Sequence, residues 1–252
     1  MSFNVSADAY ARFMGQFSEP LGEQFVELAG MRPGQRALDV GCGPGALTSR
    51  LVDRLGISAV AAIDPSESFV AATAARLPGI DVRSGVAEHL PFADDEFDGA
   101  LAQLVVHFMA DPVAGLAEMA RVTRPDGVVA ACVWDHGGNG GPLSTFWLAV
   151  HATDPDAPGE AERPGTREGH LAELCEAAGL REIEPGLLTV DVGFETFEDW
   201  WEPYTLGVGP AGAHVAGLDD AGRAALKAEC ERMLPPAPFS VAASAWSVRA
   251  RV

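Results

Sequence analysis

The stretch Ala37-Leu38-Asp39-Val40-Gly41-Cys42-Gly43-Pro44-Gly45 decides the fold of this chain. Its first half is a short apolar run of the kind that forms a buried strand, and its second half is a glycine-rich turn. Leucines at positions 47, 51 and 55 follow at the spacing of one helix face. Glycines in such a turn let the backbone reverse sharply and let a ligand approach the main chain without meeting a Cβ. The stretch therefore predicts a strand, a ligand-binding turn and a helix.

The chain downstream repeats this alternation of strand and helix. We expect strands over 59–63, near Val82, over 97–106 and over 127–134, and helices over 66–77 and 112–121. The strand segments are continuously apolar, which is typical of parallel strands covered on both faces. The sequence thus predicts an α/β fold with a Rossmann-like, doubly wound sheet. Its ligand should lie beyond the carboxyl ends of the strands.

The regular alternation stops after Asp135. We expect helices over 143–151, near Trp200, over 167–178 and over 218–233, strands over 187–192 and 239–252, and an exposed loop over 154–165, which is rich in proline, glycine and acidic residues. No repeat or linker divides the chain.

The predicted organisation is one domain over 1–252. It comprises an N-terminal helical lid over 1–34, a cofactor-binding core over 35–135, the remaining sheet and helices with inserted cap segments over 136–238, and a last strand over 239–252. A helix that simply packs on the sheet explains the N-terminal segment equally well.

Composition bounds the partners of the chain. It has 252 residues, 36 of them acidic and 17 basic, and a formal net charge of −19. Duplex binding requires clustered Lys and Arg to neutralise phosphates, and the sequence contains no such cluster, so we expect no nucleic-acid partner. The sequence has no apolar stretch near 18 residues and no signal peptide, so we expect a cytoplasmic protein with no membrane partner. The sequence carries no signal of oligomeric state.

The cysteines do not form a recognisable metal-binding pattern. Cys42, Cys132, Cys175 and Cys230 are widely spaced, and none belongs to a Cys-x-x-Cys pair. We interpret them as small apolar residues in a reducing compartment and expect neither a disulfide framework nor a metal site.

Acidic residues follow three consecutive predicted strands. Asp39 lies at the end of the first strand, where a plain strand would have an apolar residue, Asp64 ends the second, and Glu88 follows the third. An acid before the glycine turn suits a ligand with positive charge better than a pyrophosphate. A carboxylate at position 64 can accept hydrogen bonds from both hydroxyls of a ribose. The three acids therefore predict a rim for a cationic nucleoside.

These motifs resemble those of the class I S-adenosylmethionine-dependent methyltransferases. The stretch 37–45 is similar to the first motif of that family, and Gly85-Val86-Ala87-Glu88-His89-Leu90-Pro91-Phe92 with Phe97-Asp98 looks like its adenine-side loop. Arg121-Val122-Thr123-Arg124-Pro125-Asp126-Gly127 resembles the turn into the fifth strand of the ubiquinone/menaquinone-biosynthesis type of small-molecule methyltransferase. That turn usually ends in two glycines, so Asp126 departs from the pattern, outside the cofactor site. The resemblance covers residues 35–135.

The resemblance implies a seven-stranded sheet whose last strand is antiparallel to the others, S-adenosylmethionine as cofactor and a small-molecule acceptor. It also implies contacts on the amino-acid side of the cofactor. Gly41 and Gly43 would lie against this part, and Asp39 would reach its ammonium, directly or through water. Gln103 would offer its backbone carbonyl to the same ammonium.

On the nucleoside side the resemblance implies a second group of contacts. Asp64 would hold the ribose, and Pro65 or Ser66 would flank the adenine. Ala87 and Glu88 would contact the adenine through backbone and side chain. The sequence at the end of the fourth strand lacks the Asn/Asp-Pro-Pro-aromatic segment that is typical of methyltransferases acting on bases of nucleic acid, which again argues against a nucleic-acid substrate.

Methyl transfer from a sulfonium is an in-line displacement, so the position of the acceptor matters most. A base is needed only where the acceptor must lose a proton. His107, shortly after the fourth strand, is the candidate catalytic residue; the alternative is a histidine that packs near Phe108 and hydrogen-bonds the backbone. Asp135 and His136 face the same rim. Aromatic residues of the later segments either line an acceptor pocket or form the core of the cap: Phe146, Trp147, Trp200, Trp201 and Tyr204.

Two other functions remain open from the residues. The glycine turn with Ala46 also satisfies the dinucleotide pattern Gly-x-Gly-x-x-Gly/Ala, and Asp64 lies 23 residues after Gly41, as in nicotinamide-dependent oxidoreductases. Pro44 within the turn and Asp39 before it argue against that class. A non-catalytic protein that binds S-adenosylmethionine would share the cofactor site but show no turnover.

Overall fold

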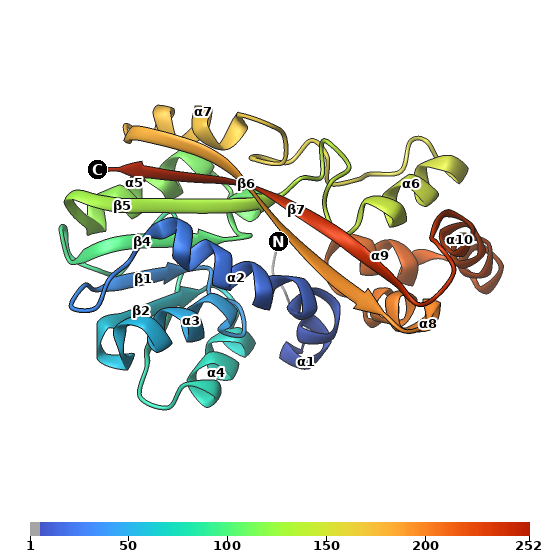
Figure 1. Ribbon diagram of the computed structural model, residues 1–252, viewed down its shortest axis with the longest axis horizontal. Coiled ribbons are helices and arrows are strands. Elements are labelled where there is room, and N and C mark those ends of the chain that lie inside the picture. Colours follow the sequence, from blue (N-terminus) through green and yellow to red (C-terminus); the bar gives the residue numbers. More distant parts are fainter. Residues whose placement is uncertain (1–5) are drawn as a thin grey trace.

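A computed structural model describes residues 6–252 of the chain. Its centre is a seven-stranded sheet with the order β3-β2-β1-β4-β5-β7-β6 (Figure 1). The strands are β1 (Ala37–Val40), β2 (Val60–Asp64), β3 (Asp81–Ser84), β4 (Phe97–Gln103), β5 (Thr123–Trp134), β6 (Arg181–Phe194) and β7 (Phe239–Arg251). The first five strands pair in parallel, and β7 lies antiparallel between β5 and β6. The predicted Rossmann-like sheet with an antiparallel last strand is confirmed.

The sheet has a hydrophobic layer on each face, because side chains alternate between the faces along a strand. On β5, Ala130, Cys132 and Trp134 belong to one buried cluster, whereas Val129, Ala131 and Val133 belong to the other. The first cluster includes α2 (Gln16–Ala29) and α3 (Ala46–Leu55), and the second includes α5 (Pro112–Val122) and α7 (His170–Ala177). A further helix, α4 (Glu67–Arg76), connects β2 to β3.

The N-terminal segment is helical. It consists of α1 (Ala7–Tyr10), a π-helix (Ala11–Gly15) and α2. Residues 1–5 of the predicted lid lie outside the described part of the chain. In Figure 1, α1 lies beyond the carboxyl ends of β1 and β2.

A group of helices lies around the end of β6 and the start of β7 (Figure 1). Its members are α6 (Ser144–Thr153), α8 (Phe197–Trp201), a 3-10 helix (Glu202–Leu206), α9 (Gly209–Gly217) and α10 (Asp220–Met233). The aromatic residues of these segments are buried together, and Phe146 stacks on Tyr204 with ring centroids 4.6 Å apart. They form the core of this helical group, which favours the second of the two interpretations given for them.

Several element boundaries differ from the sequence-based expectations, and two strands show the reasons. Strand β4 ends at Gln103 rather than near position 106, because Leu104 has a φ of 63° and Val106–Phe108 form a 3-10 turn. Strand β6 extends well beyond 187–192, since it pairs with β7 along its length. The segment 154–165 is a largely exposed loop, as expected, but it also has buried positions: Glu160 is buried and accepts a hydrogen bond from Trp147 Nε1 at 3.1 Å.

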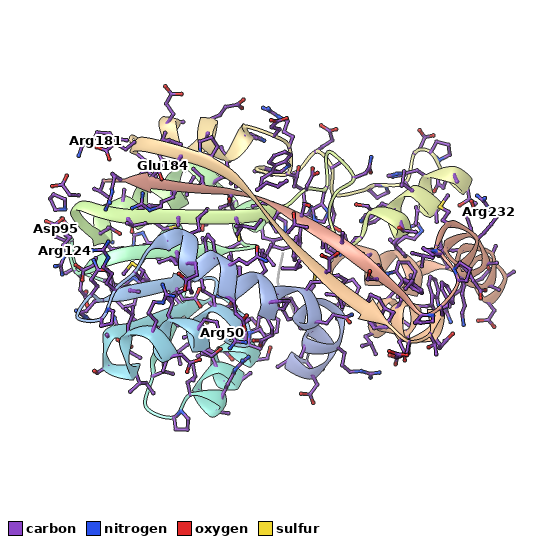
Figure 2. The ribbon with its side chains drawn as sticks, viewed as in Figure 1. Arg50, Asp95, Arg124, Arg181, Glu184 and Arg232 are labelled. Carbon is purple, nitrogen blue, oxygen red and sulfur yellow. The ribbon has the colours of Figure 1, made fainter. Side chains whose placement is uncertain are left out.

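The periphery of the molecule carries the ion pairs. Arg124 pairs with Asp98 at 2.8 Å and Glu184 with Arg249 at 3.1 Å, at the end of the sheet where β5 and β6 begin (Figure 2). Such exposed pairs contribute little to stability, typically about 0–1 kcal/mol each. None of the helices described over 6–252 is long and apolar enough to cross a membrane. Within the same residues all four cysteines are buried and none forms a disulfide bond.

Candidate functional site

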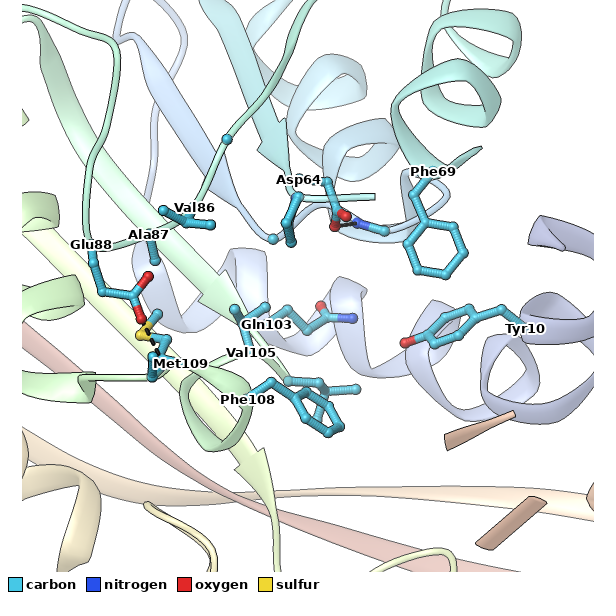
Figure 3. Close-up of a pocket in the computed structure, with 16 residues that line it drawn as sticks. Tyr10, Asp64, Phe69, Val86, Ala87, Glu88, Gln103, Val105, Phe108 and Met109 are labelled. Carbon is cyan, nitrogen blue, oxygen red and sulfur yellow. Dashed lines mark hydrogen bonds between the residues drawn. The ribbon is translucent and has the colours of Figure 1, made fainter. Parts of the chain in front are cut away.

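The candidate site lies where the winding of the sheet reverses. Strand β1 has β2 on one side and β4 on the other, so the chain connections diverge on either side of the β1–β4 pair, and ligands of such sheets bind beyond its carboxyl ends. A cavity of about 230 Å³ opens there (Figure 3). It brings together seven of the predicted site residues: Gly41, Gly43, Asp64, Pro65, Ala87, Glu88 and Gln103.

The turn after β1 is held open by two glycines with different constraints. Gly41 has a φ of 73°, and a Cβ built on it would lie 2.4 Å from Val105 Cγ2. Gly43 has a φ of 54°, but a Cβ there would meet no atom within 4 Å. Left-handed backbone favours glycine at both positions. Of the two, only Gly43 leaves open space at its Cβ position, and Gly43 lines the cavity.

Asp64 at the end of β2 connects the turn to the start of α4. Its Oδ2 accepts a hydrogen bond from Gly43 N–H, and its Oδ1 accepts one from Ser66 N–H, both at 2.8 Å. Burial raises the pKa of Asp64, and these two hydrogen bonds partly offset that effect. Each carboxylate oxygen has a further lone pair for a ligand. Ser66 does not line the cavity, and its Oγ lies 2.9 Å from Ser68 Oγ instead of capping α4.

Asp39 lies beneath the turn and lines a smaller cavity beside Gly41, together with Gln103. Thr48 Oγ1 donates to Asp39 Oδ2 at 2.6 Å, whereas Oδ1 is buried without a partner. Burial raises the pKa of Asp39 to about 7, against the hydrogen bond from Thr48, and the nearby Asp64 adds to the rise. Gln103 Nε2 donates to the carbonyl of Ser18 at 2.9 Å, and its Oε1 is also buried without a partner.

The opposite end of the cavity is formed by the segment after β3. Figure 3 shows Val86, Ala87 and Glu88 far from Tyr10, with Asp64 between them. Oε1 of Glu88 accepts hydrogen bonds from the backbone N–H groups of Ala110 and Asp111, at 2.7 and 3.2 Å. The side chain of Glu88 therefore anchors the loop that follows β4 as well as lining the cavity.

Sequence reasoning assigned no role at this cavity to five other side chains that line it: Tyr10 (considered only as part of a lid), Phe69, Val105, Phe108 and Met109. Tyr10 comes from the N-terminal helix and packs edge-on against Phe69 of α4, with ring centroids 5.2 Å apart. None of these residues belongs to the glycine motif. Val105, Phe108 and Met109 come from the segment that follows β4, whereas Tyr10 and Phe69 come from helices α1 and α4.

His107 lines a second cavity of about 40 Å³, next to the first. The two cavities share Tyr10, Leu104 and Phe108, so they are neighbours across these side chains. The ring of His107 packs against Phe108 with centroids 3.9 Å apart, which agrees with the alternative of a histidine that packs near Phe108. Its Nδ1 is buried and has no hydrogen-bond partner. His136 lines the same cavity, and its ring centroid lies 6.0 Å from that of His107.

Both imidazoles are neutral near pH 7. Burial lowers the pKa of His107 well below its usual range, and the nearby His136 and Arg163 lower it further. Burial, with the charge of Arg163, lowers the pKa of His136 to about 4. Asp135 lines neither cavity; its Oδ1 accepts hydrogen bonds from Gly138 N–H at 2.7 Å and Trp246 Nε1 at 3.0 Å, which hold the turn after β5.

Comparisons with known proteins agree with this fold and site. Residues 38–131 match the methyltransferase-domain family. The chain is 32% identical over 192 residues to a demethylmenaquinone methyltransferase of Beutenbergia cavernae, an alignment that covers 76% of this chain and 69% of that protein. It is 30% identical over 232 residues to an uncharacterized protein of Mycobacterium tuberculosis, covering 89% and 82%. The YcgJ protein of Bacillus subtilis shares the fold, with a TM-score of 0.60 at 19% identity and coverage of 93% and 97%.

The chain belongs to the class I S-adenosylmethionine-dependent methyltransferases. S-adenosylmethionine is therefore its cofactor, as the motif resemblance implied, and the nicotinamide-dependent alternative is not favoured. The residues present fit this cofactor. The open space at Gly43 can hold the part of the cofactor that lies against the main chain. The unpartnered Oδ1 of Asp39 and Oε1 of Gln103 are hydrogen-bond acceptors next to the turn that the ammonium group of the cofactor could use.

Proposed function

We propose that this methyltransferase acts on a small-molecule acceptor, which binds in the second cavity beside the cofactor cavity. The observation that carries the proposal is the shared wall of Tyr10, Leu104 and Phe108 between the two cavities. A displacement in line with the methyl–sulfur bond requires the acceptor to approach from such a neighbouring space. When bound, the cofactor supplies an electrophilic methyl group on a sulfonium. The protein supplies position, shielding from water and polar contacts.

On the amino-acid side of the cofactor, four residues carry the proposed contacts. Gly41 and Gly43 leave the main chain accessible, and Asp39 accepts from the ammonium through its unpartnered Oδ1. For Gln103 the expected contact was the backbone carbonyl. Its unpartnered Oε1 supports a second acceptor from the same residue.

On the nucleoside side, Asp64 holds the ribose, because its carboxylate is already oriented by the N–H groups of Gly43 and Ser66. Of Pro65 and Ser66, only Pro65 lines the cavity, so Pro65 flanks the adenine from one side. Ala87 contacts it from the other, together with the backbone at Glu88. Oε1 of Glu88 already accepts hydrogen bonds from the loop after β4. Glu88 therefore contacts the adenine through its other carboxylate oxygen and its main chain.

His107 contacts the acceptor in this proposal. Its ring is neutral near pH 7, so the buried, unpartnered Nδ1 can form a hydrogen bond that orients the acceptor. A group whose pKa is far below neutrality removes a proton inefficiently. The contribution of His107 is therefore orientation more than general-base catalysis. Residues 35–135 act as the cofactor-binding core, and the helices after position 136 act as a cap over the acceptor side.

The test has two stages. Calorimetry should show binding of S-adenosylmethionine and S-adenosylhomocysteine but not of NAD. Reactions with phenolic, quinone-like and amine metabolites are then analysed by mass spectrometry. One class of compound should gain the mass of a CH₂ group, because a methyl group replaces a hydrogen. Tight cofactor binding without turnover of any acceptor would instead favour the non-catalytic alternative.

A further inference from the structure

The second cavity has a mixed wall. Most of its lining is apolar or aromatic, and four ionisable side chains belong to it: Tyr10, His107, His136 and Glu160. Among the described residues that line it there is no Lys or Arg. Its volume of about 40 Å³ suits the polar head of a ligand better than a whole aromatic acceptor.

Glu160 brings a carboxylate into this wall. The residue is 3% exposed, and its Oε2 accepts the hydrogen bond from Trp147 Nε1. Within residues 6–252, no protein donor is bonded to its other oxygen, Oε1. Burial raises the pKa of Glu160, against the hydrogen bond from Trp147 and the charge of Arg163. A buried carboxylate is costly unless a cation or several donors reach it. A ligand that enters the cavity can supply such groups.

The polar groups of the wall are mainly acceptors. A carboxylate only accepts hydrogen bonds, and each neutral imidazole has one nitrogen that accepts. Both histidines are neutral near pH 7, as their burial requires. A ligand head that complements Glu160, His107 and His136 must therefore offer several donors. A primary ammonium has three N–H donors and no acceptor, whereas a hydroxyl has one donor and a carboxylate has none.

The aromatic lining and the overall charge favour a cation as well. The rings of Tyr10, Phe13 and Phe108 line the cavity, and faces of aromatic rings attract cations. The formal net charge of −19 raises the local concentration of cationic ligands. Arg163 lies behind this wall: its guanidinium carbon is 5.1 Å from the Phe108 ring centroid and it donates to the carbonyl of His107 at 3.4 Å. Its positive charge lowers the pKa of His107, His136 and Glu160, so it opposes a bound cation, and the carboxylate of Glu160 has to offset this effect.

We propose that the second cavity binds the ammonium head of a small amine with an apolar or aromatic body, which makes the enzyme an N-methyltransferase whose specificity depends on Glu160. This inference rests on the proposed function. The amine loses one proton to Glu160, which becomes a carboxylic acid. The nitrogen lone pair forms the new N–C bond as the C–S bond breaks, with the electron pair of that bond left on sulfur. The product nitrogen carries the positive charge that sulfur loses.

Binding of three matched compounds tests the choice of head group. Benzylamine, benzyl alcohol and benzoate share a ring and differ in their polar head, and each is titrated by calorimetry into protein saturated with S-adenosylhomocysteine. We expect benzylamine to bind at least tenfold more tightly than benzyl alcohol, and benzoate to bind most weakly. Equal affinities, or preference for the alcohol or the carboxylate, would overturn the proposal on the wild-type protein alone.

The variant Glu160→Gln tests the residue. It keeps the shape and the acceptor for Trp147 but removes the charge, so we expect benzylamine affinity to fall at least tenfold while benzyl alcohol affinity changes less than threefold. Glu162→Gln, an exposed neighbour on the same segment, is the matched control and should bind benzylamine as the wild type does. Unchanged benzylamine binding in Glu160→Gln would show that Glu160 does not bind the ammonium head.

The same titrations separate this inference from the proposed function. S-adenosylhomocysteine should bind the wild type and both variants with equal affinity. Failure of that binding in the wild type would contradict the cofactor site itself. Normal cofactor binding without preference for the amine would contradict only the assignment of the acceptor.

Discussion

The backbone N–H of Gly43 donates a hydrogen bond to Oδ2 of Asp64 across 2.8 Å, which joins the turn after β1 to the end of β2 at the mouth of the cofactor cavity. The other carboxylate oxygen holds the start of α4 through Ser66 N–H. The acid is thus oriented before any ligand binds, and a pre-oriented group loses less entropy on binding.

Asp64→Ala is expected to weaken cofactor binding at least tenfold, equivalent to about 1.4 kcal/mol. The variant removes the proposed acceptor for the ribose hydroxyls and also releases the N–H groups of Gly43 and Ser66. Calorimetry with S-adenosylhomocysteine measures the effect, and circular dichroism checks the fold. Asp156→Ala, an exposed acid far along the chain, serves as control. An affinity equal to that of the wild type would show that Asp64 does not hold the ribose.

Gly41→Ala should mainly lower the stability of the protein, whereas Gly43→Ala should mainly weaken cofactor binding. At Gly41 the new Cβ would meet Val105 at 2.4 Å, so we expect a loss of unfolding free energy of about 2 kcal/mol or more. At Gly43 the Cβ meets no protein atom within 4 Å, so the stability cost is limited to the left-handed backbone, about 1 kcal/mol. Its Cβ points into free space, and cofactor affinity should fall at least tenfold.

Urea unfolding and calorimetry separate these outcomes. The double variant Gly41→Ala/Val105→Ala removes the side chain that the new Cβ would meet and should recover part of the lost stability. If both single variants lose stability equally and bind the cofactor equally, the two glycines do not have the separate roles described above.

The stability of the protein should depend on pH through Asp39. Burial raises the pKa of this carboxyl from 3.8 to about 7, so the folded protein keeps a proton that the unfolded chain has lost. This contribution to the free energy of unfolding is full below about pH 4 and is lost as the pH rises through about 7. Relative to Asp39→Asn, the wild type should therefore become less stable as the pH rises from about 5 to about 7, which lies within the interval between these two pKa values, as measured by urea unfolding.

Cofactor affinity should change in the opposite direction over the same interval. Ionised Asp39 offers a charged acceptor to the ammonium, so S-adenosylhomocysteine should bind several-fold more tightly at the upper end of this interval. The Asp39→Asn variant should bind more weakly and without this rise. His136, whose pKa is about 4, does not titrate in this range. A parallel rise in the variant would exclude Asp39 as its source.

Substitutions of Tyr10 test whether the N-terminal segment acts as a lid over the cofactor. Its ring packs against Phe69 and lines both cavities, so Tyr10→Ala should weaken cofactor binding about tenfold, whereas Tyr10→Phe should bind within threefold of the wild type. Hydrogen exchange should show residues 6–15 becoming protected when S-adenosylhomocysteine binds. A helix that only packs on the sheet would exchange at the same rate with and without the ligand.

Much of the candidate cofactor site could be predicted because its residues lie at or just after the ends of strands. Each short apolar run ends at a functional group, Asp39 before the glycine turn and Asp64 at the end of β2, and parallel pairing brings these ends to one edge. The continuous apolar runs therefore located the strands and the acids together.

The acceptor side could not be predicted in the same way. Glu160 lies in a segment whose composition is typical of an exposed loop, yet Trp147 holds it inside the protein. Tyr10 precedes the glycine motif by 31 residues and reaches the cavity only because the N-terminal helices extend past α4. No local pattern encodes such contacts, since they depend on helices that meet far from each other along the chain.

The sequence by itself determined the parallel core, the glycine turn and the acids at the strand ends, because strand period and turn chemistry are local properties of the chain. Only the tertiary structure decided which side chains surround the acceptor and which of their oxygens are left without partners. Burial and hydrogen-bond satisfaction depend on every element that packs around a group, and those elements come together only in the folded protein.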